Sequence, residues 1–318
     1  MTALSSVRSR VLVMVVVSVL LVGVAVGWAY SRRTAEVPVD PDLGLRRPGL
    51  LIRDTVTGRL AVVGSDGRRS QSGISCSRVH AAAGRAVCLH PDPRTPGTFR
   101  LSVLDERLQV TRSFTIPGVP TRARVSDDGR MLAWTVFVAG DSYLTSGFST
   151  RSGVLDLATG TQVDTLEDFA LAGGTTPADA NFWGVSFAAD DRTFYATMAT
   201  GQHHYLVQGD VVARTLRVIE DQVECPSLSP DGTRLVYKLR LPDLTWQLWV
   251  LDLTSKQRTR LAEPGNVDDQ GTWLDDRTVA YAKVDETTGE PAVWSVPADG
   301  SGVPTKLADD AESPAALR

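Results

Sequence analysis

Polar side chains collect in the short segments that connect strand-like runs of this sequence, where they could hold a ligand. Two such segments are "DQVECP" (221–226) and "GNVDDQGTW" (265–273). Carboxylate and amide oxygens that meet at one place suit a cation such as calcium, which takes oxygen ligands, and they also suit a basic peptide segment. The alternative is that these groups cap strand ends and bind water. The candidate residues are Arg122, Asn181, Trp183, Glu224, Asp268, Asp269 and Gln270.

Sequence patterns that would support catalysis are absent. There is no Gly-x-Ser-x-Gly elbow, no glycine-rich loop that ends in Gly-Lys-Ser/Thr, and no His-Glu-x-x-His or paired Cys-x-x-Cys. His203 and His204 are adjacent on an expected strand, so their side chains point to opposite faces and cannot easily share a metal. We therefore predict no catalytic residue, no metal ligand set and no cofactor, with calcium as the one ion that the acidic segments could take.

Two of the three cysteines are placed to form a disulfide. Cys76 and Cys88 flank a turn centred near Ala82, and residues directly opposite in an antiparallel pair come close enough to bridge. A disulfide would indicate an oxidising compartment, whereas the alternative is two buried free thiols. Cys225 has no partner in this register and is expected to be a buried thiol, because no neighbouring base is evident.

A repeat reveals the elements that must position these groups. "CPSLSPDGTRLVYK" (225–238) is an apolar run, a turn and a second apolar run, and two more strand-like runs follow it, as in "WQLWVLDL" (246–253). Four strands in about 40–45 residues correspond to one blade of a β-propeller. Because Asp-Gly suits a tight hairpin, Asp128, Asp191, Asp231 and Asp276 in these turns are expected to be structural. Copies of the first hairpin occur at 77–90, 124–137, 185–198, 225–238 and 271–284.

The ends of the repeat region complete one more blade. Residues 49–71 hold two or three strands without a first strand, and "AESPAALR" (311–318) resembles a first strand alone. Together they would close the ring and remove its exposed edges. The sequence thus predicts an all-β, six-bladed propeller of four-stranded antiparallel blades over residues 48–318, with seven blades as the alternative and a monomer as the expected state.

An apolar segment precedes the propeller. Residues 11–30, "VLVMVVVSVLLVGVAVGWAY", contain no charge and are long enough to cross a bilayer as a helix. We predict a cytoplasmic segment at 1–10, a transmembrane anchor at 11–30 and a linker at 31–47. A cleaved signal peptide is the main alternative, a buried helix is a lesser one, and the flanking arginines do not settle the orientation.

The best repeat carries a family resemblance. "SLSPDGTRLVYK" followed by "WQLWVLDLTSKQRTRL" resembles the Pro-Asp propeller repeat of TolB-type proteins. With one N-terminal apolar segment, "FWGVSFAADDRTFYAT" and "VDDQGTWLDD", the chain is similar to membrane-anchored or exported TolB-like propellers of actinobacteria. The resemblance implies the fold and an extracytoplasmic location. It implies no defined activity, and the N-terminal α/β domain of TolB has no counterpart here.

These observations favour a binding module. In a propeller, connections between blades meet those between second and third strands on one face; we call this face, with the seven candidate residues, the channel mouth. A partner protein or envelope ligand is expected to bind there, and Asp269→Ala is expected to abolish its capture without unfolding the protein. A metal-assisted glycan lyase or hydrolase and a purely structural module are the alternatives. Nucleic acid is an unsuitable partner, because the net charge is −4.

Overall fold

The computed structural model of this chain describes residues 13–24, 38–138 and 149–318. The chain divides into two units, Met1–Val39 and Asp40–Arg318. In the first unit a helix covers residues 13–24, and no helix among the described residues combines the length and apolar character of a membrane span. The rest of the predicted anchor, 11–12 and 25–30, lies outside the described residues, as does most of the predicted connection at 138–148.

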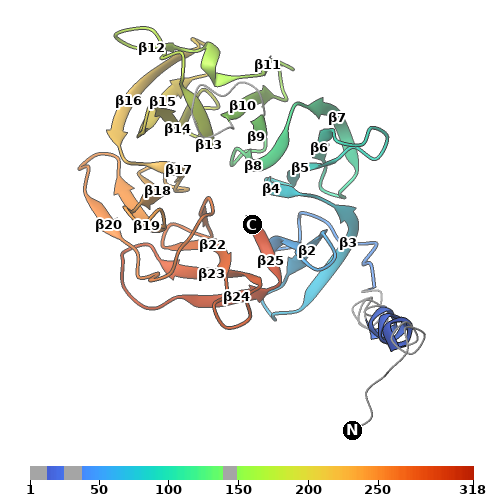
Figure 1. Cartoon of the computed structure of the whole chain (residues 1–318). Coiled ribbons are helices and arrows are strands. Elements are labelled where there is room, and N and C mark those ends of the chain that lie inside the picture. The colour runs from blue at the N-terminus through green and yellow to red at the C-terminus, as the bar shows by residue number, and fades with distance from the viewer. Residues whose placement is uncertain (1–12, 25–37, 139–148) are drawn as a thin grey trace. The chain divides into compact units, whose positions relative to one another are not determined.

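The second unit is a ring of six sheets, which confirms the predicted six-bladed propeller (Figure 1). Blade 1 contains β1 (Gly49–Asp54), β2 (Arg59–Val63), β3 (Arg69–Ser75) and β25 (Ala311–Leu317), and blade 2 contains β4 (Arg78–Ala82), β5 (Arg85–Pro91), β6 (Phe99–Leu104) and β7 (Val110–Ile116). Blade 3 contains β8 (Val119–Val125), β9 (Met131–Val138), β10 (Ser149–Asp156) and β11 (Gln162–Val163). Blade 4 contains β12 (Ala170–Leu171), β13 (Asn181–Phe187), β14 (Thr193–Thr200), β15 (His203–Asp210) and β16 (Thr215–Asp221). Blade 5 contains β17 (Glu224–Leu228), β18 (Arg234–Arg240), β19 (Trp246–Asp252) and β20 (Arg258–Arg260), and blade 6 contains β21 (Thr272–Trp273), β22 (Thr278–Val284), β23 (Pro291–Pro297) and β24 (Thr305–Asp309).

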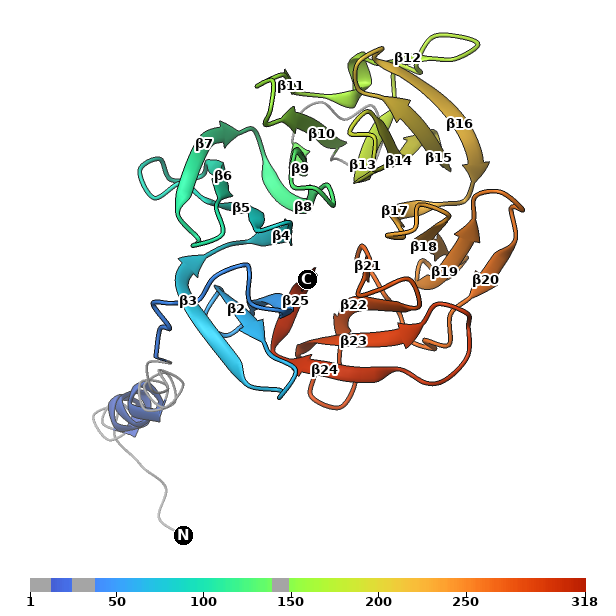
Figure 2. The same cartoon turned by 180° about the vertical axis from the view of Figure 1, so that it is seen from behind.

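Blade 1 closes the ring as predicted. Its strand order is β25-β1-β2-β3, and Leu50 of β1 pairs with Ala316 of β25. The C-terminal strand is thus the innermost strand of the blade, and Figure 2 shows its end at the centre of the ring. Pairing of two segments from opposite ends of the unit satisfies backbone groups that would otherwise form an open edge.

The repeated turns have the structural role that the sequence indicates. Gly129 and Gly232 lie between the first and second strands of their blades with positive φ, and so does Asp191 with φ 53°. The Asp231 carboxylate accepts hydrogen bonds from Ser229 Oγ (2.5 Å) and from the backbone N–H of Thr233 (3.0 Å). Such side-chain bonds to the local backbone stabilise a tight turn.

Aromatic rings cover glycines within the blades. Trp134 of β9 pairs with Gly153 of β10, and Phe194 of β14 pairs with Gly209 of β15. A Cβ atom built on Gly153 would lie 2.2 Å from the Trp134 ring, so only glycine fits beneath it. Both rings are buried, and their burial contributes to the stability of the sheets.

The insertion near residues 165–180 adds a strand to blade 4. A short 3-10 helix, η1 (Leu166–Asp168), precedes β12, which pairs in parallel with the outer strand β16. Leu166 and Phe169 are buried in the core cluster of this blade. Blade 4 therefore has five strands, whereas the sequence predicts four in every blade.

The propeller unit begins before residue 48. Leu43 and Leu45, which belong to the predicted linker 31–47, are 4% and 2% exposed and pack in the cluster between blades 1 and 2. The Leu45 N–H donates to the carbonyl of Glu106 (2.8 Å). Residues 40–47 thus belong to the propeller because these two leucines bury their side chains on it.

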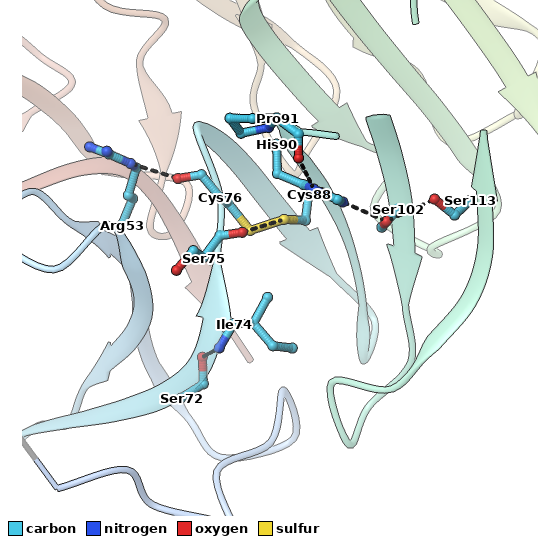
Figure 3. Close-up of a disulfide and its surroundings, with 10 residues drawn as sticks. All are labelled: Arg53, Ser72, Ile74, Ser75, Cys76, Cys88, His90, Pro91, Ser102 and Ser113. Atoms are coloured by element: carbon cyan, nitrogen blue, oxygen red, sulfur yellow. Dashed lines mark hydrogen bonds between the residues drawn. A yellow bond between two sulfur atoms is a disulfide. The ribbon is translucent and has the colours of Figure 1, made fainter. Parts of the chain in front are cut away.

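The disulfide is present, but its strand register differs from the prediction. Cys76 and Cys88 are bonded, with their Cα atoms 5.5 Å apart. The residue opposite Cys88 is Val79, because β4 begins only at Arg78. Cys76 instead lies in the connection between β3 and β4, where its carbonyl accepts a hydrogen bond from Arg53 Nε (2.7 Å) (Figure 3). The bond therefore links the junction of blades 1 and 2 to β5.

Candidate binding site at the channel mouth

The innermost strands carry more of the candidate site than the connections do. Arg122 lies on β8, Asn181 and Trp183 on β13, and Glu224 on β17. Only Asp268, Asp269 and Gln270 lie in a connection, the long loop between β20 and β21. β8, β13 and β17 begin within the predicted connections 118–123, 179–184 and 221–226, so much of these three segments is strand.

An exposed carboxylate at the channel mouth is held by two buried cations. Asp268 Oδ1 lies 2.5 Å from Lys238 Nζ and 3.7 Å from Arg122 Nη2. The Asp268 side chain is 56% exposed, whereas those of Lys238 and Arg122 are 3% and 16% exposed. Burial tends to lower the pKa of Arg122, but Cys225, Asp269 and Asp268 nearby more than offset it and raise the pKa. The Arg122 guanidinium therefore stays charged, and Lys238 and Arg122 together fix one acidic group at the surface.

Glu224 forms a second polar pair, with His204, beside the first. Its Oε1 lies 2.8 Å from His204 Nδ1, and both side chains are largely buried. Burial tends to raise the pKa of Glu224, but the hydrogen bond and charge of His204, with the charge of Lys238, lower it. The His204 ring packs edge-on against Trp183 at 5.5 Å between centroids. Glu224 and Trp183 thus lie together at the channel mouth, joined through His204.

Lys238 connects the two pairs and also contacts an aromatic ring. Its Cα is paired with that of Glu224 in the β17–β18 ladder. Its Nζ lies 4.7 Å from the centroid of Trp246, within the range of a cation–π contact. Sequence reasoning missed Lys238 and His204, because both lie within second and third strands. The Pro-Asp repeat offers no signal that their side chains approach the channel mouth.

Two predicted contact residues instead satisfy buried backbone groups. Asn181 Oδ1 accepts from the backbone N–H of Thr150 (2.9 Å), which links blades 3 and 4. Gln270 Nε2 donates to the carbonyl of Pro226 (2.8 Å) and is 7% exposed. Because backbone groups inside a protein need partners, these two amides hold neighbouring blades together.

Asp269 has both a structural contact and access to the channel. Its Oδ2 accepts from the backbone N–H of Ala282 (2.9 Å). It also lines a cavity of about 30 Å³ between the innermost strands, together with Arg122 and Gln270. In the part of the chain that the structure describes, no three His, Cys, Asp or Glu side chains are grouped to hold a metal. The calcium expectation stays a prediction.

Comparisons with known proteins identify the fold. No family model and no curated protein matches the sequence. Similar solved structures include TolB from Acinetobacter baumannii, with a TM-score of 0.58, 16% identity, and 87% of this chain and 67% of that chain covered. A putative TolB from Agrobacterium tumefaciens gives 0.50 at 14% identity, covering 83% and 89%. A Mycobacterium tuberculosis puromycin-hydrolyzing peptidase gives 0.50 at 14%, covering 80% and 42%. The chain therefore has the β-propeller fold seen in TolB proteins.

Proposed function

We propose that this protein is a non-catalytic recognition module that captures a basic segment of a partner protein at the channel mouth. The observation that carries the proposal is the exposed Asp268 carboxylate, which Lys238 and Arg122 hold from below. A contact group that is already fixed loses little side-chain freedom on binding, so more of its interaction energy is available as affinity. The proposed contact groups come from β13, from β19 and from the loop before β21.

The partner should present cationic and aromatic groups. Asp268 offers an acceptor to arginine or lysine, and charge-assisted hydrogen bonds of this kind are among the stronger polar contacts. Trp246 contacts Lys238, Trp183 contacts His204, and both tryptophans are partly exposed. Aromatic side chains with one exposed face are frequent anchors at protein interfaces. Asp268, Trp183 and Trp246 are therefore the proposed contact residues, and Glu224 supports Trp183 through its contact with His204.

The proposed location is outside the cytoplasm, with residues 11–30 as the membrane anchor. Support comes from the Cys76–Cys88 disulfide, since such bonds persist in oxidising compartments, and from the uncharged apolar run at 11–30. Protease added to intact cells should then degrade the propeller while a cytoplasmic marker survives. Protection of the propeller until the cells are lysed would contradict this location.

Affinity capture with the full-length chain tests the recognition site. The tagged protein would be purified in detergent and incubated with solubilised envelope extract from its host. Asp268→Asn keeps an acceptor for Lys238 but removes the negative charge, and we expect it to weaken partner capture at least about tenfold. Asp164→Asn, at an exposed carboxylate beside the edge strand β11, is the matched control.

Asp269→Ala is a less suitable variant than Asp268→Asn. It would also remove the hydrogen bond to the Ala282 N–H, so a loss of capture could reflect a shifted loop. Equal capture by the wild type and by a folded Asp268→Asn variant would remove the channel mouth as the recognition site. Calcium titration during capture would show whether an ion takes part.

A further inference from the structure

A second cavity lies on the opposite side of the ring from the channel mouth, next to the turns between first and second strands. It has a volume of about 290 Å³, and all six blades contribute to its wall. We call it the turn-side cavity. None of the seven channel-mouth candidates lines it. Its wall includes the polar and aromatic side chains of His80, Arg124, Asp127, Thr272, Trp273 and Arg318.

Arg124 is a buried cation without an ion-pair partner. It is 7% exposed, and its Nη2 donates to the carbonyl of Gly271 (3.3 Å) while its Nε has no hydrogen-bond partner. Among the described residues, no carboxylate forms an ion pair with it. Burial lowers its pKa to about 10, and the charges of Asp127 and Asp269 offset this only in part. An unpaired buried charge is destabilising, so its presence indicates that Arg124 binds a group of opposite charge.

His80 adds a second unsatisfied donor at the same place. Its Nδ1 lies 3.2 Å from the backbone N–H of Val125, and its Nε2 lies 2.9 Å from Arg124 Nη1. Both ring nitrogens therefore face an N–H group that can only donate, whereas a neutral imidazole offers one lone pair. One of the two contacts is donor–donor in either tautomer, and with the hydrogen on Nε2 it is the contact with Arg124. Burial and Arg124 both lower the pKa of His80, which keeps the ring neutral.

The rest of the wall also favours a negative guest. Arg318 lines the cavity and, among the described residues, donates to the carbonyls of Trp273 (3.1 Å) and Leu274 (3.3 Å). Asp127 is the one acidic residue among those lining the cavity, and it is exposed to solvent. The charged side chains of the wall are thus two arginines and one solvent-exposed aspartate, a balance that favours a negative guest.

We propose that the turn-side cavity binds the carboxylate or phosphate group of a small molecule, with Arg124 and His80 sharing one of its oxygens. An oxygen in the cavity within hydrogen-bond distance of both Arg124 Nη1 and His80 Nε2 would accept from both and relieve the donor–donor contact. The cavity has room for several water molecules, hence for inorganic phosphate or a small organic acid. None of the proposed partner contacts Asp268, Trp183 and Trp246 lines this cavity, so failure of either proposal leaves the other standing.

Calorimetric titration of the purified full-length chain tests this site. Inorganic phosphate and citrate are the two probes, each at constant ionic strength set with chloride. We expect saturable binding of at least one probe, together with a higher melting temperature in its presence. Saturation by phosphate alone or by citrate alone would support the site and identify its chemistry.

Matched arginine variants connect binding to the cavity. Arg124→Gln should weaken binding at least tenfold, whereas Arg107→Gln, at an exposed turn position, should bind like the wild type. Arg318→Gln is a second variant, at an exposed position that should not affect folding, and is expected to weaken binding severalfold. The proposal would be overturned if neither probe bound the wild type saturably. It would also be overturned if the folded Arg124→Gln and Arg318→Gln variants both bound the probe as tightly as the wild type does.

Discussion

Loss of the disulfide should destabilise the propeller by a predictable amount. The perturbation is the double variant Cys76→Ala/Cys88→Ala, in which alanine avoids placing a hydroxyl at two sites that are 4% and 1% exposed. The bond closes a loop with a sequence separation of 12. Without the bond, the connection between blades 1 and 2 is no longer covalently linked to β5. Blade 1 is also the blade that closes the ring.

The magnitude follows from the length of this loop. In the chain-entropy treatment, a crosslink of this separation lowers the entropy of the unfolded chain enough to stabilise the fold by about 3 kcal/mol. Both sulfur atoms also pack in the apolar cluster with Leu43, Leu45 and Leu51, so their removal forfeits some burial as well. We therefore expect the free energy of unfolding to fall by about 3 kcal/mol or slightly more.

The assay is urea unfolding of the full-length chain with and without reductant. The oxidised wild type should unfold at a higher urea concentration than both the reduced wild type and the double variant, and reductant should not change the variant. Thiol titration in denaturant should find one thiol before reduction, from the buried Cys225, and three after it. Identical unfolding of oxidised and reduced protein, or three thiols without reduction, would refute the reasoning.

Three further substitutions test the packing and charge pairs of the blades. Burial and the neighbouring Asp128 raise the pKa of Asp191 from 3.8 to about 6. The folded state therefore binds this proton more tightly than the unfolded state does. The stability gained from protonation is complete below pH 3.8 and is lost as the pH rises through 6. Asp191→Asn mimics the protonated form, so its stability relative to wild type should grow between pH 4 and pH 7 in urea unfolding, and a flat difference would contradict the assignment. Gly153→Ala should cost about 1–3 kcal/mol in thermal unfolding because its Cβ would meet Trp134, whereas Gly174→Ala, whose Cβ would have no neighbour within 4 Å, should be neutral. Glu263→Ala should cost about 3–5 kcal/mol because it strands the buried Lys283 and the Tyr281 hydroxyl; a loss no larger than that of the exposed Glu290→Ala would count against a buried charge pair.

The sequence determines the blades because their signals are local. A turn such as Asp231-Gly232 fixes where one strand ends and the next begins, and the apolar runs on either side identify strands that are buried on both faces. The closing blade could be predicted because residues 311–318 form a first strand with no following hairpin. The predicted cysteine register is wrong because register depends on the position of the turn centre. A turn centred one and a half residues further along moves the partner of Cys88 from Cys76 to Val79.

The candidate site could be predicted only in part, because its contacts cross between blades. Lys238 and Asp268 are 30 residues apart, and their approach depends on how blade 5 meets the loop before β21. Asn181 and Gln270 look like ligand groups in the sequence, yet they satisfy backbone groups of neighbouring blades. Nothing in the local sequence shows which backbone groups lack partners until the blades are assembled.

Photo-crosslinking in the native host tests recognition at the channel mouth most directly. A photoreactive amino acid would replace Leu244, which is 61% exposed in the connection between β18 and β19 at the channel mouth and leaves Asp268 in place. In a parallel strain it would replace Val212, which is 75% exposed in the turn between β15 and β16 on the opposite face. The account predicts one dominant crosslinked partner from position 244 and none from position 212. No adduct from position 244 in a folded protein, or the same adducts from both positions, would contradict it.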